Sequence, residues 1–82
     1  MPYVKQDRRH ALNKVVAAML EADVQADGDL NYILFAYCKY HITPSYNNYK
    51  NFCGEIHQAA TEIERRLLAP YEDMKIVENG DV

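Results

Sequence analysis

The stretch LNYILFAYCKYHI, residues 30–42, carries apolar or aromatic side chains around most of a helical turn. Residues three and four apart share a helical face, and here that face and much of the remainder are apolar. Such a helix needs cover on more than one side, so we expect it to be the buried helix of a small all-helical unit, over residues 29–42. It is shorter than the roughly 20 apolar residues that a membrane span requires, so protein must supply the cover. Asp29 is the predicted N-cap, and Thr43 and Pro44 are expected to end the helix.

The chain of 82 residues is long enough for one helical domain, residues 1–82. A domain of this size buries only about 60% of its unfolded surface, so oligomerisation is the expected source of further stability. Hydrophobic residues make up 49% of the chain, which excludes a disordered protein. The polar start, MPYVKQDRRH, is unlike a secretory signal, so we expect a cytoplasmic protein. Cys38 and Cys53 fall in expected helices and are interpreted as reduced core thiols.

The net charge of −3 lies entirely at the C-terminal end. Residues 1–71 carry eight basic and eight acidic side chains, whereas residues 72–82 carry four acidic side chains and one lysine. A neutral body with an acidic tail lacks the broad basic face that neutralises many phosphates. Duplex nucleic acid is therefore not an expected partner. A membrane is not expected either, because the apolar stretch at residues 30–42 is too short to span one.

A first helix is expected over residues 7–24, with Asp7 as its N-cap. A narrow apolar stripe runs along it, formed by Leu12, Val15, Val16, Met19 and Leu20. Lys5, Arg8 and Arg9 crowd its N-terminal end, where positive charge interacts unfavourably with the helix dipole. Two interpretations stay open: a solvated basic face, or a site for an anion or an acidic segment such as the tail.

The third expected helix is the longest, residues 44–69, with Thr43 as N-cap, Pro44 at the first helical position and Pro70 as its stop. A heptad repeat of apolar residues, here called the seam, runs along it. The seam residues are Tyr46, Tyr49, Cys53, Ile56, Ala60, Ile63 and Leu67. Because the first two helices are shorter, part of the seam stays uncovered, and the same helix from a second copy is the simplest cover. We therefore predict a helical homo-oligomer with the seam from Tyr49 onward as its interface; the alternative is that the tail folds over it.

Outside the three helices we expect an N-terminal arm, residues 1–6, and a docked acidic extension, residues 71–82. The extension is expected to pack on a neighbouring surface through its apolar side chains. A fourth helix is not expected, since Pro70 precedes this segment and Asn79-Gly80 is a turn signal.

Two cysteine–histidine pairs stand at metal-ligand spacing, Cys38 with His41 and Cys53 with His57. Four such groups complete a tetrahedral zinc site. Both pairs lie in mid-helix, however, and core packing explains both thiols, so no metal and no cofactor is expected. The pair Cys53 and His57 also lacks recognisable oxyanion donors and an orienting carboxylate, so we expect no enzyme.

Basic and aromatic residues near the end of the third helix suggest an anion site. Arg65 and Arg66 precede Tyr71 and Lys75, and two guanidiniums can bind a phosphate or a carboxylate. The other interpretation is structural, because Glu62 supports Arg66 at i,i+4 and positive charge suits a helix C-terminus. Tyrosines beside asparagines can stack a nucleobase, although they equally suit core rims and an interface. The candidate ligand-binding residues are Arg8, Arg9, Asn31, Tyr32, Arg65, Arg66, Tyr71 and Lys75.

Three segments carry a family resemblance: MPYV at residues 1–4, GDLNY at residues 28–32 and RRLLAPYEDMKIVENGDV at residues 65–82. In these segments the chain resembles a family of small, uncharacterised bacteriophage proteins that begin with MPY and carry RR..APYED.KI.ENGDV near their ends. No activity is attached to that family, so the resemblance implies a phage origin and no residue roles.

The leading hypothesis is a non-enzymatic binding protein, a host-takeover or anti-defence factor in the cytoplasm of an infected bacterium. In this hypothesis a homo-oligomer sequesters a small anionic ligand, such as a nucleotide, with Arg65 and Arg66 on the phosphate and tyrosines on the base. One alternative is an inhibitor or adaptor that binds a basic surface of a host protein through the acidic tail. Another is a structural or assembly protein.

Overall fold

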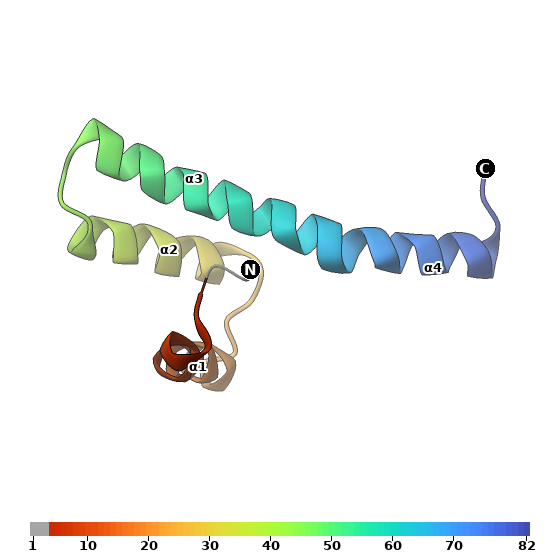
Figure 1. Cartoon of the computed structure of the whole chain (residues 1–82), viewed down its shortest axis with the longest axis horizontal. Coiled ribbons are helices and arrows are strands. Elements are labelled where there is room, and N and C mark those ends of the chain that lie inside the picture. The colour runs from red at the N-terminus through yellow and green to blue at the C-terminus, as the bar shows by residue number, and fades with distance from the viewer. Residues whose placement is uncertain (1–3) are drawn as a thin grey trace. The chain divides into compact units, whose positions relative to one another are not determined.

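The computed structural model describes residues 4–82, and that range contains helices and no strand. In chain order the elements are α1 (Gln6–Glu21), α2 (Gly28–His41), α3 (Tyr46–Ile63), a π-helical turn η1 (Glu64–Leu68) and α4 (Ala69–Asn79), shown in Figure 1. The predicted all-α fold is confirmed. Contacts divide the chain into two units, Met1–Ile42 and Thr43–Val82, and the single-domain prediction stays a prediction. Between residues 4 and 82, no helix is both long and apolar enough to cross a membrane.

The start of α1 differs from the predicted start by one residue and in its cap. Lys5 holds the N-cap position with an extended backbone and no side-chain hydrogen bond, so Asp7 as N-cap is wrong. Asp7 lies instead in the first turn, where a carboxylate suits the positive end of the helix dipole. Of the predicted N-terminal arm, residues 1–3 lie outside the described range, and Gln6 already belongs to the helix.

The end of α1 comes three residues earlier than predicted, because Asp23 adopts a left-handed backbone with φ of 53°. The N–H of Asp23 donates to the carbonyl of Leu20, and the N–H of Val24 donates to the carbonyl of Met19, both at 3.1 Å. This pair of bonds is the Schellman ending, which satisfies the last carbonyls and turns the chain away from the helix axis.

The start of α2 is capped two residues earlier than predicted. Asp27 is the N-cap, and its Oδ1 accepts a hydrogen bond from the N–H of Asp29 at 2.9 Å. Asp29 as N-cap is therefore wrong, and its own Oδ2 accepts from the N–H of Gln25 at 3.2 Å. The helix ends at His41, one residue before the predicted end.

The start of α3 is set by Ser45, whose extended backbone and side chain form the N-cap. Its Oγ accepts from the N–H of Asn48 at 3.0 Å, and the Asn48 side-chain amide donates to the carbonyl of Thr43 at 2.9 Å. The predictions of Thr43 as N-cap and of Pro44 inside the helix are therefore wrong. A serine one residue after proline has the backbone freedom and the oxygen that a cap needs.

The predicted helix stop at Pro70 is wrong, and so is a non-helical extension, because α4 begins at Ala69 and runs to Asn79. In the π turn η1, the N–H of Ala69 donates to the carbonyl of Glu64, five residues back. Proline lacks an N–H, and in an α-helix its ring clashes with the carbonyl four residues earlier. A π turn is wider than an α turn and directly precedes the proline, so the helical path continues, as the unbroken ribbon from α3 to α4 shows (Figure 1). Whether this segment docks on a neighbour stays a prediction.

No side chain among residues 4–82 is buried. The prediction that α2 is a buried helix is therefore wrong for the single chain, in which Tyr32 is 72% and Tyr40 81% exposed. An all-round apolar helix needs cover on several sides, and residues 4–42 of its unit contain one other helix to supply it. Ile33 and Leu34 are consequently only half-buried.

Candidate functional site

The basic pair predicted as an anion site lies in the π turn η1, one turn after Glu62. Arg65 Nη2 donates to Glu62 Oε1 at 2.8 Å, and Arg66 Nη1 lies 3.6 Å from the same oxygen. The hydrogen bond from Arg65 lowers the pKa of Glu62. The side chains of Arg65 and Arg66 are 71% and 59% exposed, against 19% for Glu62. Two guanidiniums that share one carboxylate retain one positive charge and several N–H donors for a further anion.

The other half of the predicted clamp lies further along α4 and has its own partner. Lys75 Nζ lies 3.4 Å from Glu78 Oε2 and 5.7 Å from the centre of the Tyr71 ring. Tyr71 and Lys75 line a shallow hollow near the end of α4, whereas Arg66 lines a different hollow beside the seam residue Ile63. The four clamp residues therefore follow one helix, but the hollow beside Tyr71 and Lys75 and the hollow beside Arg66 have no lining residue in common.

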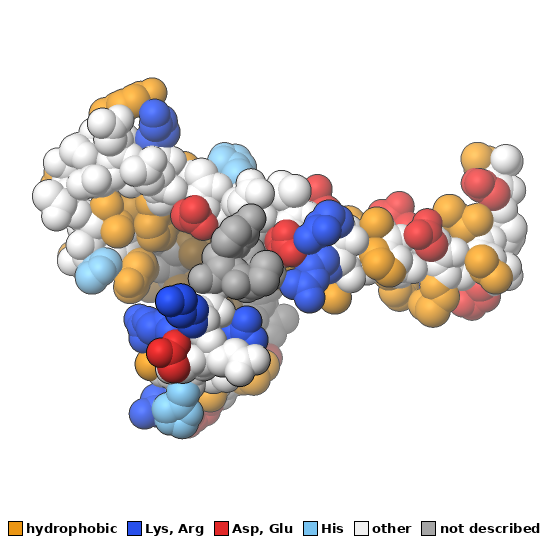
Figure 2. All heavy atoms as spheres, viewed as in Figure 1, with side chains coloured by type: hydrophobic (Ala, Val, Ile, Leu, Met, Phe, Trp, Pro, Cys, Tyr) orange, Lys and Arg blue, Asp and Glu red, His pale blue; other side chains and the backbone are white. Residues whose placement is uncertain are grey.

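A second basic group lies on α1, over which Figure 2 shows Lys and Arg side chains. Arg9 Nε donates to the carbonyl of Val4 at 3.0 Å, which ties this guanidinium to the residues just before the helix. Arg8 is exposed on the same first turns. Both belong to the unit Met1–Ile42, while Arg65 and Arg66 belong to the unit Thr43–Val82.

Asn31 and Tyr32 lie in the first turns of α2. The N–H of Asn31 donates to the carbonyl of Asp27 at 3.2 Å, as a helical residue does after the N-cap. Tyr32 is exposed and borders a shallow hollow together with Asp29. A carboxylate in that hollow repels an anion, so this tyrosine is poorly placed to stack a base beside a bound phosphate.

The two cysteine–histidine pairs occupy separate helices, Cys38 and His41 on α2 and Cys53 and His57 on α3. In the described part of the chain, no three His, Cys, Asp or Glu side chains gather in a group that could hold a metal ion. The His41 ring instead lies against the ring of Tyr37, with centroids 5.0 Å apart. Cys38 is half-buried and Cys53 exposed, so Cys53 becomes a core thiol only when another surface covers the seam.

The seam is exposed along much of α3. Ile63 is 56% and Leu67 66% exposed, and Cys53 and Ala60 are exposed as well, while Ile56 is half-buried. Large apolar side chains at regular spacing on one helix face are the surface that a second helix covers in a coiled-coil-like pair. That this face is an interface between copies of the chain stays a prediction.

The sequence did not predict two features of this region. The first is the π turn, whose signal in the sequence is Pro70 within an otherwise helical pattern. The second is the carboxylate that two arginines share, because Glu62 has an arginine at both i+3 and i+4, and only the i+4 partner, Arg66, was expected from the sequence. The shorter contact is the one to Arg65.

Comparison with known protein families identifies a match over the whole chain. The model of a family described as "Domain of unknown function (DUF6899)" matches residues 1–82. No curated protein and no solved structure matches the chain.

Proposed function

We propose that this chain, which belongs to the family DUF6899, acts by binding and not by catalysis, as a homo-oligomer that sequesters a small anionic ligand such as a nucleotide. The observation that carries the proposal is the pair of exposed guanidiniums on one carboxylate, Arg65 and Arg66 on Glu62. An arginine fork matches the oxygens of a phosphate, and the excess positive charge of the cluster favours an anion.

The ligand competes with Glu62 for the two guanidiniums. Arg66, whose nitrogen is 3.6 Å from the carboxylate, is the easier one to recruit, while Arg65 keeps its 2.8 Å hydrogen bond and stays in place. Both side chains stand on consecutive residues of the π turn. Glu62 therefore orients the pair before the ligand arrives.

The homo-oligomer is supported by burial. No side chain among residues 4–82 is buried in the single chain, and the seam offers a continuous apolar face. A small chain without a core of its own gains stability when a second copy covers such a face.

The biological setting follows from the resemblance to small phage proteins at residues 1–4, 28–32 and 65–82. The proposed role is that of a host-takeover or anti-defence factor in the cytoplasm of an infected bacterium. Sequestration of a nucleotide signal needs a binding site and no catalytic group.

Thermal shift with a panel of nucleotides tests the proposal, because a ligand at 100 times its dissociation constant stabilises the folded state by about 2.7 kcal/mol. The double variant Arg65→Gln, Arg66→Gln should lose that shift and keep its helical circular dichroism. Lys14→Gln with Lys39→Gln removes the same charge elsewhere and should bind as the unchanged protein does. No shift with any phosphate-bearing ligand, or an equal loss in both double variants, would contradict the proposal.

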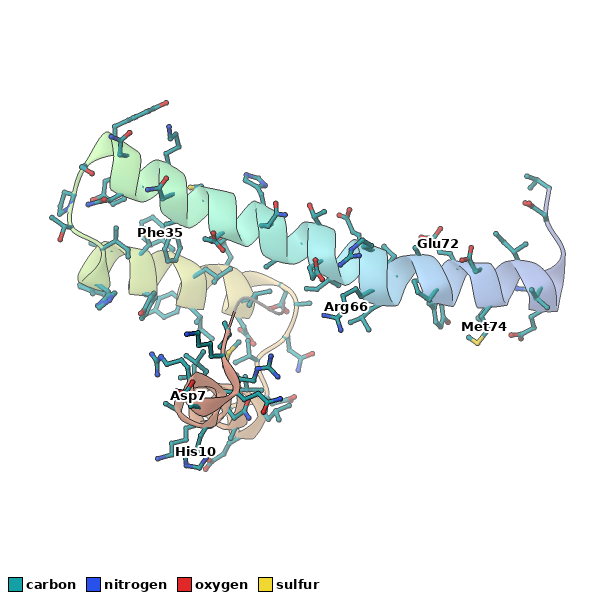
Figure 3. All side chains as sticks on the ribbon, in the orientation of Figure 1. Asp7, His10, Phe35, Arg66, Glu72 and Met74 are labelled. Carbon is teal, nitrogen blue, oxygen red and sulfur yellow. The ribbon has the colours of Figure 1, made fainter. Side chains whose placement is uncertain are left out.

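A second candidate, an adaptor or inhibitor that binds a host protein, is favoured by α4. Val77 is 88% and Met74 52% exposed, between the carboxylates of Glu72, Asp73 and Glu78. Figure 3 shows Met74 and Glu72 on opposite sides of this helix. A helix with apolar side chains on one side and acidic ones on another suits a basic protein surface with a hydrophobic centre. Met74→Ala with Val77→Ala should then abolish partner binding and leave the nucleotide shift unchanged.

A further inference from the structure

We infer that two copies of the long helix pair antiparallel through the seam, about a two-fold axis near His57 and Gln58. This inference rests on the proposed homo-oligomer and adds its partner surface, orientation and register. Length supports a second copy as the occupant. At about 1.5 Å per residue the continuous helix from Tyr46 to Asn79 is roughly 50 Å long, against roughly 20 to 25 Å for α1 and α2. A second copy of the long helix matches it along its whole seam.

The π turn extends the seam by one position. A π turn holds about one more residue than an α turn, so the seam position after Leu67 moves from residue 70 to Tyr71. Tyr71 is 54% exposed and therefore free to be covered. The proline thus leaves the seam and an aromatic side chain takes its place.

An axis near Gln58 pairs all eight seam residues in an antiparallel dimer. Residues at equal distances on either side of the axis face each other across it. The facing pairs are Ile56 with Ala60, Cys53 with Ile63, Tyr49 with Leu67, and Tyr46 with Tyr71. The first three pairs each join a larger side chain to a smaller one, and the fourth joins two tyrosine rings of equal size. Such pairs fill the space between two helices without large gaps.

One flank of the seam supports the same axis through its charges. On this flank Lys50, His57 and Glu64 recur every seven residues, so antiparallel pairing about His57 places Lys50 of each copy opposite Glu64 of the other. On the other flank Ala59 lies next to the axis, where its small side chain allows close approach.

Parallel pairing lacks these contacts. It places Cys53 on Cys53 and Ala60 on Ala60, and it puts the acidic α4 of one copy beside the acidic α4 of the other. Parallel helix dipoles also repel, whereas antiparallel ones attract. Charge therefore selects the antiparallel orientation.

Disulfide cross-linking tests orientation and register in a Cys38→Ser background that retains Cys53. With Ile63→Cys added, oxidation by diamide should link most chains into covalent dimers, because residues 53 and 63 face each other between copies. Within one chain these residues are ten positions, about 15 Å, apart on a helix, so a bridge inside the chain is excluded. Efficient dimers from Cys53 alone would show a parallel pair. Efficient dimers with Tyr71→Cys in place of Ile63→Cys would show an axis moved toward α4. Either result overturns the inference while the homo-oligomer stands.

Charge reversal provides the second test, by sedimentation across a concentration range. Lys50→Glu should weaken the dimer about 30-fold, since it turns two flank pairs of roughly 0.5 kcal/mol each into repulsions of similar size. Glu64→Lys should do the same, and the two changes together should restore the unchanged affinity within about twofold. If the two changes instead weaken the dimer additively in the double variant, Lys50 of one copy does not face Glu64 of the other. A wild-type chain that is monomeric at every concentration contradicts the homo-oligomer itself.

Discussion

Helices α2 and α3 are both rich in tyrosine and apolar residues, but only α3 gathers them on one face. In α2 the side chains of Tyr32, Phe35 and Tyr40 are all strongly exposed and lie on different faces of the helix. In α3 the seam occupies one side, and charged residues such as Glu55 and Glu62 occupy the rest. One stripe specifies one partner with one register, whereas an all-round apolar helix needs several partners and specifies none of them.

The largest effect on dimer stability should follow from a charged residue placed in the seam. Ile63→Glu buries an unpaired carboxylate when a second copy covers the seam, and such a charge costs about 3 to 5 kcal/mol. The dimer should therefore weaken by at least about 100-fold, with unchanged helical content, in light scattering and circular dichroism. A variant that remains dimeric would show that the seam is not the interface.

A smaller effect, on the free energy of unfolding, should follow from the loss of an apolar side chain in α2, whose apolar residues do not form a single face. Leu34 is half-buried, so Leu34→Ala should lower the free energy of unfolding by roughly 1 to 2 kcal/mol, less than for a fully buried leucine. Tyr40→Ala is the matched control, since Tyr40 is 81% exposed in the single chain. Urea unfolding measures both. A large loss at Tyr40 would reveal a surface that covers α2 in the assembly.

The N-cap of α3 provides the next test, with an expected effect of about 1 kcal/mol on the free energy of unfolding. Ser45→Ala removes the oxygen that accepts from the N–H of Asn48 and should destabilise by about 1 kcal/mol in urea unfolding. Thr43→Ala, at the cap predicted from the sequence, should have little effect, because the bond to Thr43 uses its backbone carbonyl. A larger loss of stability for Thr43→Ala than for Ser45→Ala would indicate that Thr43 is the N-cap.

The smallest effect concerns Glu62, whose pKa is lowered by the hydrogen bond from Arg65. A carboxyl group with a lowered folded-state pKa stabilises the folded chain above its ordinary pKa, and that contribution is lost as the pH falls through the folded-state value. In an NMR titration, Arg65→Gln should return the pKa of Glu62 toward its ordinary value. Arg66→Gln should change it less, because its nitrogen is 3.6 Å away and not 2.8 Å. Equal changes would show that the two arginines share Glu62 evenly.

The sequence alone determined the helical class, the approximate positions of α1, α2 and α3, and the seam. These follow from the spacing of apolar residues, which depends only on the period of the helix. The Arg66–Glu62 pair was likewise predictable, since residues four apart on a helix are neighbours.

Only the three-dimensional structure decided where each helix begins and ends. Asp27 and Asp29 compete for one cap, as do Thr43 and Ser45, and the backbone angles that choose between them are set by the turn as a whole. Pro70 is the clearest case. Its ring is a helix stop by local chemistry, yet the widened turn at Glu64–Leu68 accommodates the ring, because a π turn lengthens the hydrogen bond span to five residues and moves the clashing carbonyl away.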